Sequence, residues 1–137
     1  MAALAREDAH FDIEGRGGDM EALEASRAED FLADPSVLFW VAEEGVQVVG
    51  FLFCHILKMR AGVGQEILLY EIGVRRKNRR QSVGRALQKT VEAWMRKKGI
   101  AEIWVLADNP GALEFYKDCG FEGNEGMAVY LTKRVEN

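Results

Sequence analysis

Apolar residues recur at helical spacing in one stretch past the middle of the chain. They follow one another at intervals of four, four and three residues, at Val83, Leu87, Val91 and Trp94. This spacing places the four side chains on one face of an α-helix. The basic residues 96–98 suit the negative end of the helix dipole, and Gly99 favours the left-handed conformation that ends many helices. The pattern therefore predicts an amphipathic helix that ends at Gly99.

Three segments before this helix have the composition of β-strands. Residues 38–42 and 46–57 are rich in β-branched and aromatic residues, and Glu44-Gly45 separates them, which predicts a hairpin. The third segment, 66–74, contains the apolar run 67–70, of the kind found in strands that are buried on both faces. We expect this third segment to be the central strand of a sheet.

Shorter elements are predicted on either side. The N-terminal residues up to Leu32 show loose helical spacing that glycines interrupt at 15–18, which predicts two short helices with Asp19 as the cap of the second. After the amphipathic helix we expect a strand at 103–106, a helix at 111–117 that begins near Pro110, and a last strand at 127–131. A strand, a helix and a strand in this order imply parallel neighbours joined by a right-handed crossover. The predicted fold is a mixed, mostly antiparallel α/β sheet with flanking helices and a central strand-helix-strand unit.

The length and composition fit one domain that spans residues 1–137. Of the 137 residues, 48% are apolar and 29% are charged, which are ordinary values for a globular protein. The longest apolar stretch, 37–42, is far shorter than the roughly 20 residues of a membrane-spanning helix, and the N-terminal segment lacks the apolar core of a signal peptide. We therefore expect a cytoplasmic protein that has no membrane partner.

Cysteine and histidine spacing gives no sign of a metal site. Cys54 and Cys119 lie far apart without the spacing of a zinc site, and neither His10 nor His55 has a second ligand at a suitable distance along the chain. We expect two reduced structural thiols and no metal.

Charge is distributed unevenly along the chain. Residues 1–50 carry 12 acidic and 3 basic side chains, a net charge of −9, whereas residues 51–137 carry 10 acidic and 15 basic side chains, a net charge of +5. Ten of those cations fall within 75–98, together with one acid, Glu92. Such a chain can hold an anionic ligand beside a cationic one, or its charges can form solvated faces without a ligand.

The segment 79–86 is a candidate anion site between the central strand and the amphipathic helix. Unpaired N–H groups at a helix N-terminus bind phosphate, and the small residues Ser82, Gly84 and Ala86 allow a close approach. Five cations in 75–80 surround the turn, so the segment predicts a pyrophosphate site, although it matches neither the Walker motif nor GxGxxG. A basic helix start on a solvated face is the alternative. A nucleic-acid site is disfavoured, because the other segments are acidic and no aromatic residues alternate with the cations.

Three motifs occur one after another within residues 36–134. They are Tyr70-Glu71-Ile72-Gly73-Val74, then Arg79-Arg80-Gln81-Ser82-Val83-Gly84-Arg85-Ala86-Leu87, then Asn109-Pro110-Gly111-Ala112-Leu113-Glu114-Phe115-Tyr116-Lys117-Asp118-Cys119-Gly120-Phe121. In this order they resemble the GNAT superfamily of acetyl-CoA-dependent N-acetyltransferases. The resemblance implies a strand that pairs with pantetheine, a pyrophosphate loop and a helix near the thiol.

The resemblance also implies which residues hold acetyl-CoA. They are Ile72, Gly73, Val74, Arg79, Arg80, Gln81, Ser82, Val83, Gly84, Arg85, Ala86, Asn109, Ala112 and Tyr116. Ser82 stands where the family usually has the middle glycine of its loop, which keeps the N–H donor but adds a hydroxymethyl group near the phosphates. Nothing before Ala2 could supply the first strand of the family, so we expect that strand to be missing.

Within the superfamily, the segment 66–74 followed by Arg79-Arg80-Gln81 resembles the aminoglycoside 3-N-acetyltransferases. This resemblance implies a role in antibiotic resistance and an acid at Glu71 that takes the proton of the acceptor amine, directly or through water. The hydroxyl of Tyr116 would protonate the departing thiolate or hold the sulfur. Glu122 and Glu125 could complete an anionic cleft, with Glu125 in contact with the substrate. Because Glu71 follows the apolar run 67–70, the sequence also predicts that it is an acid buried in a strand, which is costly for an unpaired carboxylate. An ion pair with an arginine is the structural alternative for Glu71, and simple packing is the structural alternative for Tyr116.

The same motifs leave other functions open. The acceptor could be a polyamine, a protein N-terminus or a lysine, and the chain could also be a module that binds acyl-CoA without turnover. Direct attack in a ternary complex is expected, because neither cysteine has a histidine at a spacing that would activate it. Related enzymes are often dimers, so a homodimer is among the expected assemblies.

Overall fold

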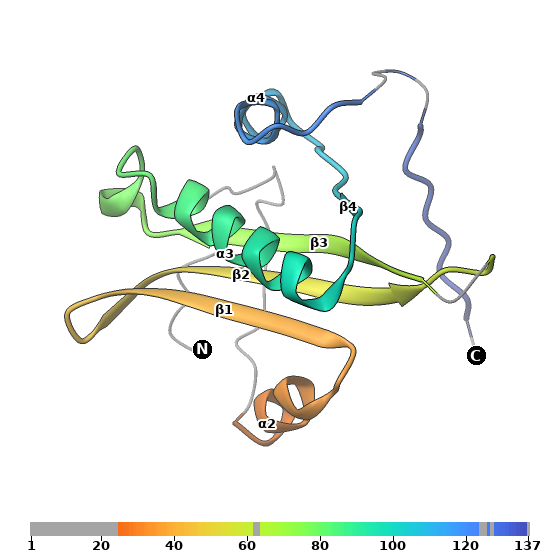
Figure 1. The fold of residues 1–137 in the computed structure, drawn as a ribbon, viewed down its shortest axis with the longest axis horizontal. Helices are drawn as coiled ribbons and strands as arrows, with labels where there is room; N and C mark the ends of the chain where they lie inside the picture. Colours follow the sequence, from red (N-terminus) through yellow and green to blue (C-terminus); the bar gives the residue numbers. More distant parts are fainter. Residues whose placement is uncertain (1–24, 62–63, 124–125, 127, 137) are drawn as a thin grey trace.

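A sheet of four strands in the order β1-β2-β3-β4 lies at the centre of the fold (Figure 1). This computed structural model describes residues 25–61, 64–123, 126 and 128–136. β1 (Val37–Glu44) and β2 (Gln47–Lys58) form the predicted hairpin, and Gly45 in its turn has a φ of 62°. β2 pairs in antiparallel orientation with β3 (Gln65–Val74), which pairs in parallel with β4 (Ile103–Trp104). The predicted mixed sheet, with β3 in its interior, is confirmed.

Helices lie on both faces of this sheet. Because side chains alternate along a strand, Leu52 and Cys54 of β2 point toward α3 (Val83–Lys98), whereas Phe51 and Phe53 point to the opposite face. There the ring of Phe31 from α2 (Ala25–Ala33) meets Phe53 edge-on, with ring centroids 4.8 Å apart. α3 and α2 therefore pack on opposite faces of the sheet, and in Figure 1 α3 lies across the strands while α2 lies at the bottom, next to β1.

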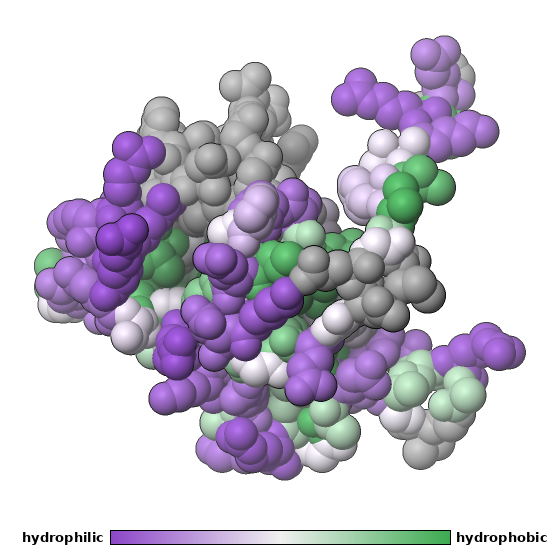
Figure 2. Space-filling view, turned by 90° about the horizontal axis from the view of Figure 1, so that it is seen from above, coloured by the Kyte–Doolittle hydropathy of each residue, from purple (hydrophilic) through white to green (hydrophobic). Residues whose placement is uncertain are grey.

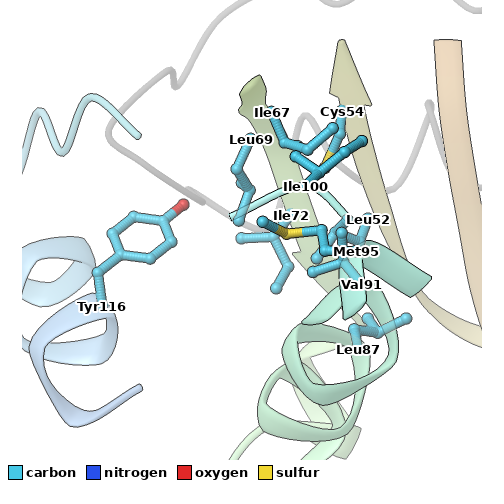
Figure 3. Packing of buried hydrophobic residues seen from close by; sticks show 10 residues of the cluster. All are labelled: Leu52, Cys54, Ile67, Leu69, Ile72, Leu87, Val91, Met95, Ile100 and Tyr116. Atoms are coloured by element: carbon cyan, nitrogen blue, oxygen red, sulfur yellow. The ribbon is translucent and has the colours of Figure 1, made fainter. Parts of the chain in front are cut away.

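The amphipathic helix α3 follows the sequence pattern. Its apolar stripe is buried at Leu87, Val91 and Met95, and Gly99 ends it with a φ of 70°. Figure 3 shows these side chains packed on residues of β2 and β3, while Tyr116 reaches toward the same cluster from α4 (Pro110–Asp118). The main buried core is thus shared by the sheet, α3, Ile100 and Tyr116, and two further residues of α4, Ala112 and Phe115, pack against it. None of the helices in the described part of the chain is long and apolar enough to cross a bilayer.

β3 is less enclosed than its apolar run predicts. Ile67 and Leu69 are buried against α3, but Tyr70 is 38% exposed and Glu71 is half-buried. The register of β2 and β3 shifts here, because Tyr70 is an extra residue in β3. Leu69 and Ile72 on either side belong to the α3 core, so the bulge leaves both Tyr70 and Glu71 off that face. The prediction that β3 is buried on both faces was therefore wrong.

The C-terminal strands also differ from the prediction. Only Ile103 and Trp104 pair with β3, so the strand expected at 103–106 is shorter. Beyond Trp104, β4 and β3 are no longer paired. Residues 128–131 form no strand, and Val129, Tyr130 and Leu131 are exposed. A strand needs a neighbouring backbone to pair with, and this segment pairs with none among the described residues. The first predicted helix, the cap at Asp19 and the question of a missing first strand fall on residues 1–24, outside those described.

Candidate functional site

A cleft of about 630 Å³ opens where β3 and β4 separate, between the start of α3 and α4. It collects residues of all three sequence motifs. Of the fourteen residues predicted to hold the cofactor, eleven line it: Ile72, Val74, Arg79, Arg80, Ser82, Val83, Gly84, Arg85, Asn109, Ala112 and Tyr116. Segments that lie up to 46 residues apart in sequence, from Ile72 to Asp118, thus form one site.

Five further lining residues were not predicted: Asn78, Gly111, Glu114, Phe115 and Asp118. Four of them belong to α4, where the helical repeat brings positions 111, 114, 115 and 118 to the same side as Ala112. The helical periodicity of the third motif could have identified these four. Asn78 lies in a run of basic residues, and nothing in the sequence of that run indicates that Asn78 lines the cleft.

Three predicted cofactor residues do not line the cleft. They are Gly73, Gln81 and Ala86. Gly73 pairs across the sheet with Phe51, whose ring lies where a side chain at position 73 would stand. Position 73 therefore requires a glycine, because a side chain there would collide with the Phe51 ring on the opposite face of the sheet.

The start of α3 has the features of an anion site. Ser82 is its N-cap residue, but its side chain makes no capping hydrogen bond, and the first turn contains no acid. The first N–H groups of a helix have no partner within it, so those at Val83, Gly84 and Arg85 are left to a ligand in the cleft that these residues line. Arg79, Arg80 and Arg85 add positive charge along the same cleft.

Gly84 allows α3 to lie close to α4. A Cβ atom at this position would stand 3.1 Å from the Cε2 and Cζ atoms of Phe115 and 3.8 Å from the Cδ1 atom of Ile72. Because the first distance is shorter than ordinary van der Waals contact, the absent side chain at Gly84 brings the two helices together. A small residue at this position was predicted for the approach of a phosphate, and the structure shows that it also sets the packing of Phe115.

Hydrogen bonds hold the basic loop before α3 to the start of β2. η2 (Arg76–Asn78) lies in this loop. Next to it, Arg75 donates from its backbone N–H to the carbonyl of Val49 at 2.8 Å and from Nε to the carbonyl of Val48 at 2.6 Å. Lys77 donates from Nζ to Oε1 of Gln47 at 3.1 Å. Some of the cations in 75–80 therefore hold the loop, and Arg79 and Arg80 face the cleft. Figure 2 shows hydrophilic side chains gathered at this end of the molecule, on its left.

α4 begins differently from α3. The Oδ1 atom of Asn109 accepts a hydrogen bond from the N–H of Ala112 at 2.8 Å, as N-cap residues do. Its Nδ2 atom is buried and has no partner among the described residues. Asn109 therefore caps its own helix with the oxygen and leaves only the amide nitrogen for a ligand.

Tyr116 combines packing with a place at the cleft. It is 2% exposed, and its ring meets those of Phe115 and Phe121 at centroid distances of 5.3 and 5.4 Å. Its hydroxyl points toward Leu69 and Ile72 of β3 (Figure 3). The side chain thus belongs to the core and also lines the cleft, so both expectations for it, as packing residue and as lining residue, agree with the geometry.

Glu71 lies on the other face of the sheet. It pairs across the strands with Phe53, which belongs to the cluster on the α2 face, whereas the cleft residue Ile72 pairs with Leu52 in the α3 core. Glu71 is half-buried and is not a lining residue of the cleft. The expectation of a buried acid was therefore wrong, because the bulge at Tyr70 turns Glu71 off the α3 face. Glu125, the other predicted substrate residue, lies outside the described residues, and Glu122 is exposed.

The cysteines are poor candidates for covalent catalysis. Burial raises the pKa of the Cys54 thiol to about 12, and burial also raises the pKa of the half-buried Cys119. A thiol is nucleophilic as its thiolate, and both shifts disfavour that form at neutral pH. Within the described residues, histidine, cysteine and acidic side chains form no group of three that could hold a metal ion.

Comparison with known proteins identifies the family. Residues 5–121 match the model of the acetyltransferase (GNAT) family, which is more than half of the chain. The chain belongs to the GNAT family. An uncharacterized N-acetyltransferase of Methanocaldococcus jannaschii is 36% identical over 102 residues, which cover 71% of this chain and 45% of that protein. The chain thus matches less than half the length of this curated relative.

Solved structures with the same fold include two aminoglycoside acetyltransferases. One, from an uncultured soil metagenomic sample and in complex with sisomicin, has a TM-score of 0.83 and 20% identity over 97% of this chain and 86% of its own. The other, an aminoglycoside N-acetyltransferase in complex with CoA, has a TM-score of 0.67 and 21% identity over 80% of this chain and 85% of its own. At this level of identity the likeness establishes the GNAT fold.

Proposed function

We propose that this chain transfers an acetyl group from acetyl-CoA to a primary amine of a cationic small molecule, an aminoglycoside. The observation that carries the proposal is the start of α3, which has no side-chain cap and no acid in its first turn, in a cleft that three arginines line. Backbone N–H groups and guanidinium groups are the donors that a pyrophosphate requires. The family match and the CoA complex of a structure with the same fold support the same cofactor.

The separation of β3 from β4 supports a reaction across the sheet. The strands pair only as far as Leu68 and Trp104, and beyond this pair the cleft lies on one face of β3 and Glu71 on the other. An amine that approaches from the Glu71 side can meet a thioester carbonyl at the inner end of the cleft. The two reactants would then need no covalent intermediate on the protein.

Proton transfer is assigned to two side chains. The amine nitrogen forms a bond to the carbonyl carbon and the carbon–sulfur bond breaks, while Glu71 takes the proton of the amine, directly or through water. The thiolate of CoA takes a proton from the hydroxyl of Tyr116. General acid and base groups of this kind typically contribute about 10²- to 10⁴-fold to a rate.

The acceptor that we propose is an aminoglycoside. A polycation matches the net charge of −9 in residues 1–50, and a structure with the same fold is that of an aminoglycoside acetyltransferase in complex with sisomicin. The 3-amino group is the position that the sequence resemblance implies. A polyamine or peptide amine is the alternative acceptor.

A panel of amines tests the function. We expect mass spectrometry to detect an acetylated product and free CoA with a kanamycin-type or gentamicin-type aminoglycoside, and NMR of the product to place the acetyl group on the 3-amino nitrogen. Products with spermidine or a short peptide alone would replace the aminoglycoside by that acceptor. Binding of acetyl-CoA without any product would favour a module that binds acyl-CoA without turnover.

Replacement of Glu71 tests the base. Glu71→Gln should lower turnover of an aminoglycoside about 100-fold and leave the Kd of acetyl-CoA unchanged, since Glu71 does not line the cleft. Higher pH should partly restore the rate, because more of the amine is then free base. Glu66→Gln, which removes the same charge at the start of β3, should keep normal turnover. Normal turnover and an unchanged pH–rate profile in Glu71→Gln would show that Glu71 is structural.

A further inference from the structure

Asn78 is the buried polar residue of an otherwise exposed basic loop. Its side chain is 4% exposed, although Arg76, Lys77, Arg79 and Arg80 around it are all exposed. It also lines the cleft. A buried amide is costly unless its donors and acceptors are matched, and only the nitrogen of this amide has a partner among the described residues.

The orientation of the Asn78 amide is fixed by a carboxylate. Its Nδ2 atom donates to Oε2 of Glu44 at 2.8 Å and lies 3.4 Å from Oε1 of Gln81. Glu44 is the last residue of β1, and as a carboxylate it can only accept hydrogen bonds. The nitrogen must therefore face Glu44, because the opposite orientation would place two oxygens against each other.

The Oδ1 atom of Asn78 is left without a partner. It is buried, and no donor reaches it among the described residues. Within the cleft, the phosphates of acetyl-CoA only accept hydrogen bonds at neutral pH, but the amide N–H groups and hydroxyl of the pantetheine arm, the ribose hydroxyl and the adenine amino group can donate. The unmatched acceptor fits one of these neutral donors.

We propose that Asn78 binds a neutral N–H or O–H donor of acetyl-CoA through Oδ1, and that Glu44 positions it by holding its amide nitrogen. The inference rests on the proposed function, which supplies the cofactor. It adds to the anion site of α3 a contact that recognises an uncharged part of the same ligand. Glu44, outside the cleft, then acts on the cofactor only through Asn78.

Replacement of Glu44 by glutamine tests the positioning. The amide of a glutamine can donate as well as accept, so Glu44→Gln allows the Asn78 amide to turn over. The Nδ2 atom of Asn78 would then face the donor of the cofactor, and two donors cannot form a hydrogen bond with each other. We expect the Kd and KM of acetyl-CoA to rise about three- to tenfold, the range of one hydrogen bond, with kcat and the melting temperature of the free protein unchanged. Glu43→Gln removes the same charge from the exposed neighbouring residue and should leave the Kd at the wild-type value.

Asn78→Ala tests the contact itself. Calorimetry should show the same rise in the Kd of acetyl-CoA, and a matched titration with S-acetylpantetheine distinguishes the source of the donor. A loss for both ligands places the donor in the pantetheine arm, and a loss for acetyl-CoA alone places it in the nucleotide. An unchanged Kd in Asn78→Ala and Glu44→Gln, with normal binding by the wild type, would overturn the inference, whereas a wild type that does not bind acetyl-CoA would overturn the proposed function.

Discussion

Ser82 is one of two described non-glycine residues, with Arg80, whose backbone has a positive φ. Its φ of 63° lies in the left-handed region, which favours glycine because a Cβ atom is crowded there. Ser82 stands in place of the glycine that is usual in the family, and this left-handed backbone is the physical reason for that glycine. The hydroxyl gives no compensation at this helix start, since it makes no capping bond.

Ser82→Gly should therefore stabilise the protein. Glycine removes the strain that a Cβ atom causes at this positive φ, so the free energy of unfolding should rise by about 1 kcal/mol. This corresponds to a rise in the melting temperature of about 3 °C. The Kd of acetyl-CoA should stay equal or fall. Ser82→Ala is the control, because it removes the hydroxyl but keeps the crowded Cβ atom, and it should give no gain. A large loss of acetyl-CoA binding in Ser82→Gly would show that the hydroxyl is itself a ligand.

Tyr116→Phe separates the packing of the ring from the chemistry of the hydroxyl. The ring contacts with Phe115 and Phe121 remain in the variant, so the Kd of acetyl-CoA should stay unchanged. Turnover should fall about 100-fold if the hydroxyl protonates the thiolate. Tyr70→Phe removes a hydroxyl from an exposed residue that does not line the cleft and serves as the control. Steady-state rates equal to those of the wild type would assign Tyr116 to packing alone.

At the scale of single residues, the sequence predicted the residues that line the cleft better than it predicted the surroundings of Glu71. The small residues and arginines in 79–86 signalled the cleft, because a helix start binds anions through atoms that every residue has. Glu71 was predicted to be buried because its neighbours 67–70 are apolar. A one-residue bulge at Tyr70 reversed its face, and no composition signal marks a bulge. Asn78 was missed because the residue that fixes its amide, Glu44, lies 34 residues earlier in the sequence.

At the scale of elements, periodic patterns were reliable and pairing was less so. α3 matched its apolar stripe and its Gly99 end, and the β1–β2 hairpin matched its turn at Gly45, because local sequence controls both. The last predicted strand did not form at 128–131. An alternating apolar segment becomes a strand only beside another strand, and that neighbour is a tertiary property.

The contact of α3 with α4 gives a prediction at this scale. In Gly84→Ala the new Cβ atom meets the Phe115 ring at 3.1 Å, so Phe115 should shift and the cleft should change shape. We expect the Kd of acetyl-CoA to rise about tenfold, or about 1.4 kcal/mol. The double variant Gly84→Ala/Phe115→Ala should recover part of this loss in calorimetry, because the overlap is then removed. No recovery would place the effect of Gly84 on the phosphate approach instead.

At the scale of the whole molecule, the net charge opposes the proposed cofactor. The chain carries −4 at pH 7, and acetyl-CoA is a polyanion, so the overall field repels it. Arg79, Arg80 and Arg85 along the cleft attract it locally, although Glu114 and Asp118 of α4 line the same cleft. The homodimer and the cytoplasmic location stay predictions, since no described feature tests them.

The sign of the salt dependence shows which of these fields controls binding. Salt screens charges over about 10 Å at 0.1 M, so it weakens binding if the nearby arginines dominate and strengthens binding if the net charge does. We expect the Kd of acetyl-CoA to rise several-fold between about 50 and about 500 mM KCl. Arg85→Gln should flatten this dependence, whereas Lys97→Gln, which makes the same charge change at the far end of α3, should retain it. A Kd that falls with salt in the wild type would mean that the net charge of the chain, and not the arginines of the cleft, dominates the electrostatics of binding.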